Sequence, residues 1–192
     1  RTMSKAELRR EFLKRRSELS SKQVGENSRM IADRLFSAAD LRQVHTVHIF
    51  ISIPKFNEVD TSLMIRRIWL EHPEIRTAAP KTHLDTGELE HIAFSSETLM
   101  AENSWGISEP SSGVRVEPPE MDLVIVPLLC FDLTGHRTGY GKGFYDRFLA
   151  ACRSDCVKIG VSHFEPVDRI DGIGGHDIRL DACITPQHTY TF

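Results

Sequence analysis

The 192-residue sequence has little of what marks secreted, membrane-spanning or zinc-binding proteins. It contains only four cysteines, none in a Cys-x-x-Cys pair, so a disulfide framework is not expected. No apolar run is long enough to span a bilayer, and the polar N-terminus is not a signal peptide. The nine histidines are scattered without the His-x-x-x-His spacing of helical zinc sites. We therefore expect a cytoplasmic protein with reduced thiols and no membrane partner.

The chain also lacks a strong charge of either sign. Its formal net charge is −3 and it carries no basic stripe, so a nucleic-acid partner is not expected. Hydrophobic residues make up 40% and charged residues 27%, as in ordinary globular proteins. The length suits one domain. With Met3 interpreted as the natural start, the domain is predicted to span residues 3–192, as a monomer or a weak oligomer.

Helical and strand periodicities alternate along the chain. Helices are predicted after Ser4 (a capping box with Glu7), after Ser20–Ser21, after Asp60, and over 145–152. Strands are predicted at 47–53, 75–79 (ending at Pro80), on both sides of the turn at 85–87, and at 123–126, 157–161 and 182–185. A short helix is expected from 95 to 100, and a long loop from 103 to 120. This order predicts an α/β fold, a single three-layer domain with a mostly parallel central sheet flanked by helices.

The most informative segment joins a buried strand to a helix. It runs Asp122-Leu-Val-Ile-Val-Pro, then Phe131-Asp132, then Gly135 to Arg147. The strand delivers this loop to the carboxyl edge of the sheet, where open α/β sheets bind ligands. The glycines at 139, 141 and 143 let the backbone approach phosphate groups closely, and the next helix presents free N–H groups to an anion.

Charged side chains in this loop strengthen the prediction of a phosphate site. Arg137 and Lys142 supply positive charge, and Asp146 offers a hard oxygen ligand for Mg²⁺. The loop is not a Walker A motif, because Lys142 is followed by Gly143 rather than Ser or Thr. It is not the dinucleotide fingerprint either, because the third glycine is one position early. The alternative is a flexible glycine turn without a ligand, which the interleaved charges make the weaker interpretation.

On these residues the sequence resembles the 5-formyltetrahydrofolate cyclo-ligase family, also called 5,10-methenyltetrahydrofolate synthetases. The shared signature is Asp-hydrophobic-Ile-Val-Pro, Phe-Asp, then Gly-x-Arg-x-Gly-x-Gly-Lys-Gly-aromatic-Tyr-Asp, and the resemblance extends from Lys5 to Thr185. The chain departs from the family pattern at Leu128 (usually Gly), Thr138 (often Leu), Phe144 (often Tyr) and near Glu165-Pro166, where a Gln is frequent.

The resemblance implies roles for particular residues. It implies an ATP site at Lys5, Arg9, Arg137, Gly139, Tyr140, Gly141, Lys142, Gly143, Phe144 and Tyr145, with Arg137 and Lys142 catalytic. It implies a folate site at Ile51, Glu58, Trp105 and Tyr140, and Mg²⁺ ligands at Asp146 and Asp177. Taken singly, several of these residues have plainer interpretations: Lys5 and Arg9 as a solvated helix face, and Trp105 as core filling.

The family activity implied is the ATP- and Mg²⁺-dependent cyclisation of 5-formyltetrahydrofolate, with or without a polyglutamate tail, to 5,10-methenyltetrahydrofolate, ADP and phosphate. Phosphorylation of the formyl oxygen by ATP would make that oxygen a leaving group. Two alternatives stay open from the residues alone. One is an ATP-dependent small-molecule kinase, which would release a stable phosphorylated product. The other is a non-catalytic folate- or nucleotide-binding protein, which would bind ligand without turning over ATP.

Overall fold

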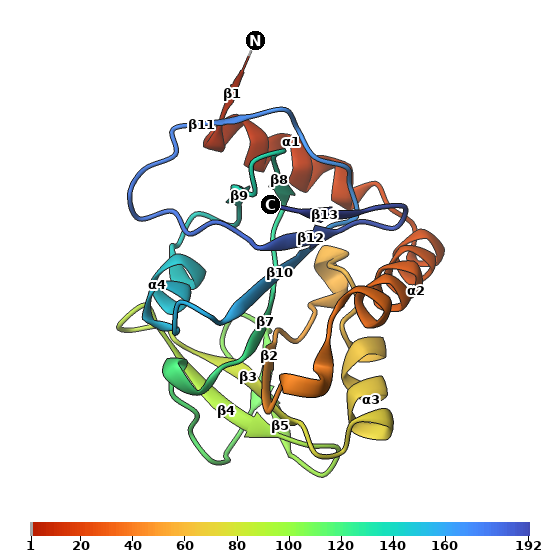
Figure 1. The fold of residues 1–192 in the computed structure, drawn as a ribbon. Helices are drawn as coiled ribbons and strands as arrows, with labels where there is room; N and C mark the ends of the chain where they lie inside the picture. Colours follow the sequence, from red (N-terminus) through yellow and green to blue (C-terminus); the bar gives the residue numbers. More distant parts are fainter. Residues whose placement is uncertain (1) are drawn as a thin grey trace.

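A seven-stranded sheet forms the centre of the computed structural model, which describes residues 2–192 (Figure 1). Its strand order is β13-β12-β10-β7-β2-β3-β4. The five inner strands are parallel, and the two outer strands pair antiparallel with their neighbours. The strands are β2 (Thr46–Ile49), β3 (Arg76–His83), β4 (Glu88–Phe94), β7 (Leu123–Val126), β10 (Val157–Val161), β12 (Ala182–Ile184) and β13 (Thr189–Thr191). The predicted mostly parallel sheet is confirmed.

The order of the parallel strands reverses between β2 and β7. Along the chain these strands come in the order β2, β3, β7, β10, β12, but β2 lies in the sheet between β3 and β7. Connections after β2 and β7 therefore leave in opposite directions, which opens a crevice beyond the carboxyl ends of the two strands. In open α/β sheets this switch point is where ligands bind.

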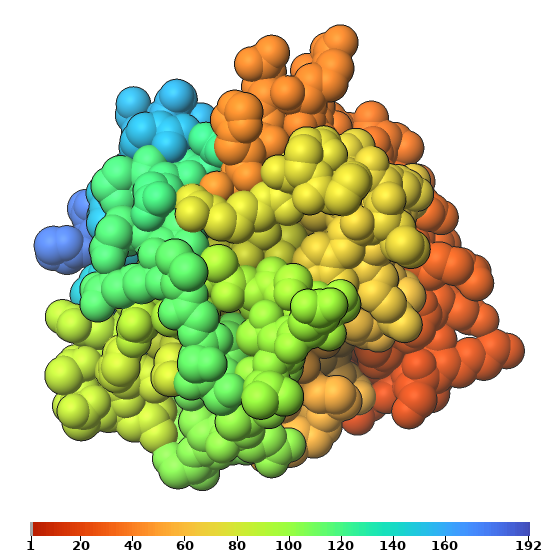
Figure 2. Space-filling model, turned by 90° about the horizontal axis from the view of Figure 1, so that it is seen from below, coloured from red at the N-terminus to blue at the C-terminus, as the bar shows by residue number. Residues whose placement is uncertain are grey.

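Helices cover both faces of the sheet and one of its ends. The helices are α1 (Lys5–Ser17), α2 (Ser21–Ala38), α3 (Ser62–Glu71) and α4 (Phe144–Ala151). The α2 and α3 helices pack on one face, and α4 packs on the other. Figure 1 shows α1 lying across the carboxyl end of the sheet, above β8. The opposite end is formed mainly by the segments around α3 and β3 to β6, drawn in yellow and green in Figure 2.

The sequence of β7 explains why it lies at the centre. All four of its residues are buried, and because strand side chains alternate in direction, Leu123 and Ile125 enter the core under α2 and α3. Val124 and Val126 enter the second core under α4. A strand apolar on both faces can satisfy this arrangement only between two helical layers. A third, smaller cluster joins Leu8 and Phe12 of α1 to the chain beyond β7 and to Ile170.

Several predicted elements differ in extent. The predicted strand 47–53 is β2, which ends at Ile49 because Ile53 N–H bonds the Glu58 carboxylate and Phe50 C=O bonds the Thr61 hydroxyl. Strand β3 begins at Arg76 and continues through Pro80 to His83. Its pairing with β2 ends at Ala78, so Pro80, which has no N–H to donate, lies beyond the part that pairs with β2. Helix α3 has Thr61 as its N-cap, although the Asp60 carboxylate accepts the Ser62 N–H.

The short helix expected from 95 to 100 is wrong. Thr98 closes a turn on Ser95, and Met100–Glu102 forms strand β5, which pairs with β6 (Ser108–Pro110) inside the predicted long loop. The remaining short elements are β1 (Met3–Ser4), β8 (Cys130–Phe131), β9 (Arg137–Thr138), β11 (Ile170–Asp171), η1 (Leu41–Gln43), η2 (Pro54–Phe56) and η3 (Pro118–Glu120). Within residues 2–192, no helix has the length and apolar character needed to cross a membrane.

We expect the central strand to carry much of the stability. Ile125→Ala should lower the free energy of unfolding by about 2–5 kcal/mol, because the surrounding core is too tightly packed to fill the cavity. Urea unfolding measures the change. Leu70→Ala, at a position 84% exposed on α3, is the control and should change stability by no more than about 0.5 kcal/mol. Equal effects at the two positions would contradict this packing account.

Candidate active site

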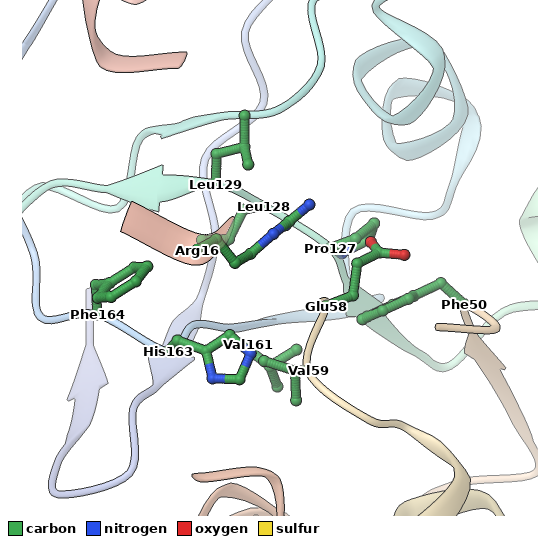
Figure 3. Close-up of a pocket in the computed structure, with 10 residues that line it drawn as sticks. All are labelled: Arg16, Phe50, Glu58, Val59, Pro127, Leu128, Leu129, Val161, His163 and Phe164. Atoms are coloured by element: carbon green, nitrogen blue, oxygen red, sulfur yellow. The ribbon is translucent and has the colours of Figure 1, made fainter. Parts of the chain in front are cut away.

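A cavity lies at the switch point between β2 and β7. Its walls come from the segments that follow these strands and β10, and from α1 (Figure 3). Its free volume is about 10 Å³, room for roughly one water molecule, so a ring-shaped ligand would enter only as the lining side chains move. The lining residues are Arg16, Phe50, Glu58, Val59, Pro127, Leu128, Leu129, Val161, His163 and Phe164. The walls are mostly apolar, with Arg16, Glu58 and His163 as the polar groups.

A hydrogen-bonded chain joins the glycine loop to this cavity. The guanidinium of Arg16 donates to the hydroxyl of Tyr140 and lies 5.5 Å from the centre of its ring. The Tyr140 hydroxyl in turn bonds the carboxylate of Glu58. Arg16 also donates through Nε to the carbonyl of Phe56, at 2.8 Å. The loop tyrosine is therefore held between a buried cation and a buried anion.

Glu58 is held at the cavity wall by the backbone. Its Oε1 accepts the Ile53 N–H at 2.8 Å, which fixes the carboxylate where the chain turns out of β2. Burial raises the pKa of this carboxyl, while the Ile53 hydrogen bond, the Arg16 charge and the Tyr140 hydroxyl act against that rise. Burial and the neighbouring Glu58 raise the pKa of Tyr140. The tyrosine thus stays a neutral hydroxyl that donates to the carboxylate.

Helix α1 also supports the glycine loop. Arg9 Nε donates to the carbonyl of Gly139 at 2.9 Å. Gly141 has a φ of +90°, and a Cβ there would lie 3.1 Å from the Arg9 guanidinium, so both its conformation and its surroundings favour glycine. Gly143 (φ +71°) precedes α4, and no side chain caps that helix. Backbone N–H groups at the start of α4 are therefore available to an anion.

Arg137 is positioned by a tight hairpin between β8 and β9. The buried Asp132 carboxylate accepts the N–H groups of Thr134, His136 and Ile170 at 2.9–3.0 Å and so fixes the turn before Arg137. The Arg137 guanidinium then reaches the carboxylate of Asp146 at 3.2 Å. This hairpin therefore brings a cation to the N-terminal turn of α4.

The two predicted metal ligands lie on either side of Arg137. Asp146 Oδ1 accepts the Ile178 N–H at 3.0 Å, while Arg137 donates to the Ile178 carbonyl at 2.8 Å. Asp177, one residue before Ile178, makes an ion pair with Lys5 Nζ at 2.7 Å. Burial acts to raise the pKa of Asp177, but the Gly174 N–H, Lys5 and Arg137 outweigh it and the net shift is downward. Both carboxylates therefore lie next to cations: Asp146 beside Arg137, and Asp177 beside Lys5 and within the influence of Arg137.

This donor set fits the way proteins hold Mg²⁺ with a nucleotide. Mg²⁺ is usually held by one or two carboxylates, with phosphate oxygens and water completing the shell. Asp146 and Asp177 supply two such carboxylates beside the glycine loop. No group of three or more His, Cys, Asp or Glu residues suited to a metal occurs between residues 2 and 192, so a site built from protein ligands alone is not indicated there.

Lys142 in the loop and Tyr145 in the first turn of α4 each have a polar side-chain group without a hydrogen-bond partner among the described residues. Lys142 is exposed, and no residue in the described part of the chain pairs with its ammonium group. The Tyr145 hydroxyl is buried without a hydrogen-bond partner, and it lies close enough to Glu58 and Arg137 to feel their charges. The two side chains are free to meet a ligand that lies between the cavity and the loop.

Three of the four predicted folate residues are not among the residues that line the cavity. Ile51 packs against the core cluster under α2, and its neighbour Phe50 lines the cavity instead. Trp105 is 46% exposed in a turn that approaches Lys55, since a Cβ at Gly106 would lie 2.9 Å from Lys55 Nζ. Tyr140 is the third, and it contacts two lining residues, Arg16 and Glu58, whereas Glu58 itself lines the cavity.

Sequence reasoning missed four residues of the cavity: Arg16, Phe50, His163 and Phe164. A signal for Arg16 is present in the sequence. The buried face of α1 consists of Leu8, Phe12 and Arg16, each four residues from the next, so a charged residue continues an apolar stripe. His163 and Phe164 lie at the start of the 164–175 segment, where the chain departs from the family pattern, and periodicity carries no information there.

Three histidines that form hydrogen bonds through their rings, His48, His91 and His163, make the stability of the protein sensitive to acid. His163 accepts from the Asn27 amide at Nδ1 (3.2 Å) and donates from Nε2 to the Asn57 carbonyl (2.9 Å), which fixes it as neutral. Burial lowers its pKa to about 4. The buried pair His48 and His91 bond each other at 2.9 Å. Burial lowers the pKa of His91 to about 4 and lowers that of His48 well below its usual value.

The free energy of unfolding should therefore fall on acidification from about pH 6.5 towards pH 4. In this range the histidines bind protons in the unfolded chain but stay neutral in the folded protein, because their pKa values are lower there. Each histidine contributes at most about 1.4 kcal/mol per pH unit to the slope. The raised pKa of Glu58 has the opposite effect on stability, so the test compares variants rather than the wild-type protein alone. His163→Gln should reduce the change of unfolding free energy with pH, as measured by urea unfolding at several pH values. The exposed His45→Gln should leave it unchanged. An unaltered slope in the His163 variant would contradict this assignment.

Comparison with known proteins assigns nearly the whole chain to a single family. The model of the 5-formyltetrahydrofolate cyclo-ligase family matches residues 1–186. The 5-formyltetrahydrofolate cyclo-ligase of Escherichia coli is 30% identical over 181 residues, which cover 92% of this chain and 97% of that protein. The Haemophilus influenzae protein of the same name is 28% identical over 151 residues, covering 77% and 79% of the two chains.

Solved structures agree with this assignment. The NMR structure of Aquifex aeolicus 5,10-methenyltetrahydrofolate synthetase superposes with a TM-score of 0.83 at 29% identity, covering 98% of this chain and 93% of that one. The Mycoplasma pneumoniae 5,10-methenyltetrahydrofolate synthetase superposes with a TM-score of 0.72 at 24% identity, covering 96% and 99%. The second likeness is evidence of the shared fold alone.

Proposed function

The chain belongs to the 5-formyltetrahydrofolate cyclo-ligase family, and on that premise we propose that it uses ATP and Mg²⁺ to convert 5-formyltetrahydrofolate to 5,10-methenyltetrahydrofolate. ADP and phosphate are the other products. The observation that carries this proposal is the hydrogen-bonded chain from the glycine loop through Tyr140 to Glu58. This contact supports the proposal because it joins the glycine loop to the lining of a mostly apolar cavity. A cytoplasmic location is part of the proposal and is supported by the four free cysteines.

The pterin ring would enter the cavity between its apolar walls. Glu58 would accept hydrogen bonds from the 2-amino group and the ring N3–H, since an ionised carboxylate only accepts. Phe50 and Leu128 would contact the faces of the ring. The formyl group and N10 would then lie towards Tyr140 and the glycine loop. This placement brings the formyl oxygen to the side from which the nucleotide phosphates approach.

The reaction needs positioning and charge neutralisation more than covalent help from the protein. The formyl oxygen attacks the γ-phosphorus and ADP leaves. N10 then attacks the activated formyl carbon, and phosphate and the N10 proton leave as the ring closes. Lys142, Arg137 and Arg9 would neutralise the transferring phosphoryl group, and the N–H groups at the start of α4 would bind its oxygens. Mg²⁺ held by Asp146 and Asp177 would neutralise phosphate charge when bound.

A two-readout assay tests this proposal. Purified protein is mixed with 5-formyltetrahydrofolate, and the absorbance of the methenyl product and the release of inorganic phosphate are followed together. We expect both to rise in equal amounts, and only when ATP and Mg²⁺ are present. A stable phosphorylated folate without ring closure would indicate a kinase instead. Ligand binding with no ATP turnover would indicate a binding protein.

Lys142 offers a clean test of the phosphoryl contact. Lys142→Met should lower kcat at least about 100-fold, because a cation that stabilises developing charge is lost. Its side chain is exposed and unpaired among the described residues, so the urea-unfolding midpoint should stay unchanged. The matched control is Lys22→Met on α2, an exposed lysine paired only weakly with Glu26 at 3.9 Å. Near-normal kcat in the Lys142 variant would remove this residue from the mechanism.

A further inference from the structure

Arg16 is a buried cation whose hydrogen-bonding capacity is mostly unused. The residue is 4% exposed, which is rare for arginine, and no carboxylate forms a direct ion pair with it among residues 2–192. A guanidinium carries five N–H donors. Only two bonds are made, from Nε to the Phe56 carbonyl and from one terminal nitrogen to Tyr140. The other terminal nitrogen is not among the fully buried atoms that lack a partner, so it keeps some accessible surface, and Arg16 is one of the residues that line the cavity.

The unused donors of Arg16 lie beside the Glu58 carboxylate. Both groups line the cavity, and the Tyr140 hydroxyl contacts both of them: it accepts from the Arg16 guanidinium and interacts with the Glu58 carboxylate. Figure 3 shows the guanidinium and the carboxylate at the same side of the cavity, next to Pro127. A donor and an acceptor are therefore presented side by side at one apolar-walled pocket.

This pairing complements one edge of a 4-oxopterin. Along that edge the 2-amino group and N3–H donate, and the neighbouring 4-oxo group accepts. Glu58 can serve the two donors, since an ionised carboxylate has about four acceptor positions and Ile53 and Tyr140 use two of them. The 4-oxo group then needs a donor next to the carboxylate. We propose that Arg16 donates to the 4-oxo group and makes the site selective for 4-oxopterins over 4-aminopterins.

The preference for a 4-oxo over a 4-amino group would follow from the hydrogen bond that the Arg16 guanidinium loses, rather than from a difference in shape. A 4-amino group is nearly the same size as an oxo group, but it presents N–H groups to the Arg16 guanidinium, so donor faces donor in a desolvated pocket. Sites that hydrogen-bond a substrate group reject an analogue lacking it strongly, because the buried partner is left unsatisfied. The inference rests on the proposed binding of the pterin at Glu58.

The test uses folic acid and aminopterin; in aminopterin an amino group replaces the 4-oxo group, and N3 consequently carries no hydrogen. Their dissociation constants are measured by competition against 5-formyltetrahydrofolate, at a pH where both rings are neutral. The wild-type protein should bind folic acid at least about tenfold more tightly than aminopterin. Because the missing N3–H also weakens the contact with Glu58, Arg16→Met should keep part of that preference but lower it several-fold, chiefly by weakening folic acid, and Arg16→Lys should restore part of the loss. Arg10→Met, an exposed position on α1, is the matched control and should keep the wild-type ratio.

The ratio separates recognition from a structural role. If Arg16 only held Phe56 and Tyr140 in place, its loss would weaken both ligands equally, and an unchanged ratio in Arg16→Met would overturn the inference. Equal affinities in the wild-type protein would overturn it as well, even if the Met variant did not fold. Formation of the methenyl product by the wild-type protein is measured separately. Product formation with an unchanged ratio rejects only the role of Arg16, whereas absence of product rejects the proposed function.

Discussion

The reversal of strand order between β2 and β7 is the constraint on which the rest of the structure depends. Parallel strands deliver their following loops to one edge of the sheet, and at this reversal the loops diverge and leave a crevice. The chain after β2 supplies Phe50 and Glu58, and the chain after β7 supplies Pro127 and Leu128. The position of the cavity therefore follows from topology, before any particular side chain is considered.

Helix α1 converts that crevice into a site with two parts. Lys5 meets Asp177, Arg9 supports Gly139, and Arg16 reaches the cavity. Eleven residues of helix rise by about 16 Å, so one rigid element spans the distance from the Asp177 carboxylate to the cavity. The apolar contacts of Leu8 and Phe12 fix this helix on the edge of the sheet. The packing of Leu8 and Phe12 therefore also fixes the positions of the three cations on the other side chains of α1.

Much of this architecture could be predicted from the sequence. The continuous apolar run at β7, the capping box at Ser4 and the glycine spacing are local signals, and the structure agrees with each of them. The loop Tyr140 was assigned to both the nucleotide and the folate on resemblance, and its bonds to Arg16 and Glu58 give that double assignment a physical basis. The short helix expected near Ser95 failed because pairing of β5 with β6 overrode a capping pattern. Arg16 was missed because a single arginine on an apolar helix face becomes meaningful only when the fold brings its partners to it, from 40 positions away at Phe56 and 124 at Tyr140.

The central claim is that the site holds the formyl oxygen against the γ-phosphate, so that ATP makes this oxygen a leaving group. Its most direct test follows the oxygen atom itself. 5-Formyltetrahydrofolate with an isotopically heavy formyl oxygen is converted in ordinary water, and the released phosphate is examined by mass spectrometry. The account predicts one heavy oxygen in each phosphate released. Unlabelled phosphate, with the heavy oxygen recovered in water, would mean that the formyl oxygen is never phosphorylated and would contradict the account.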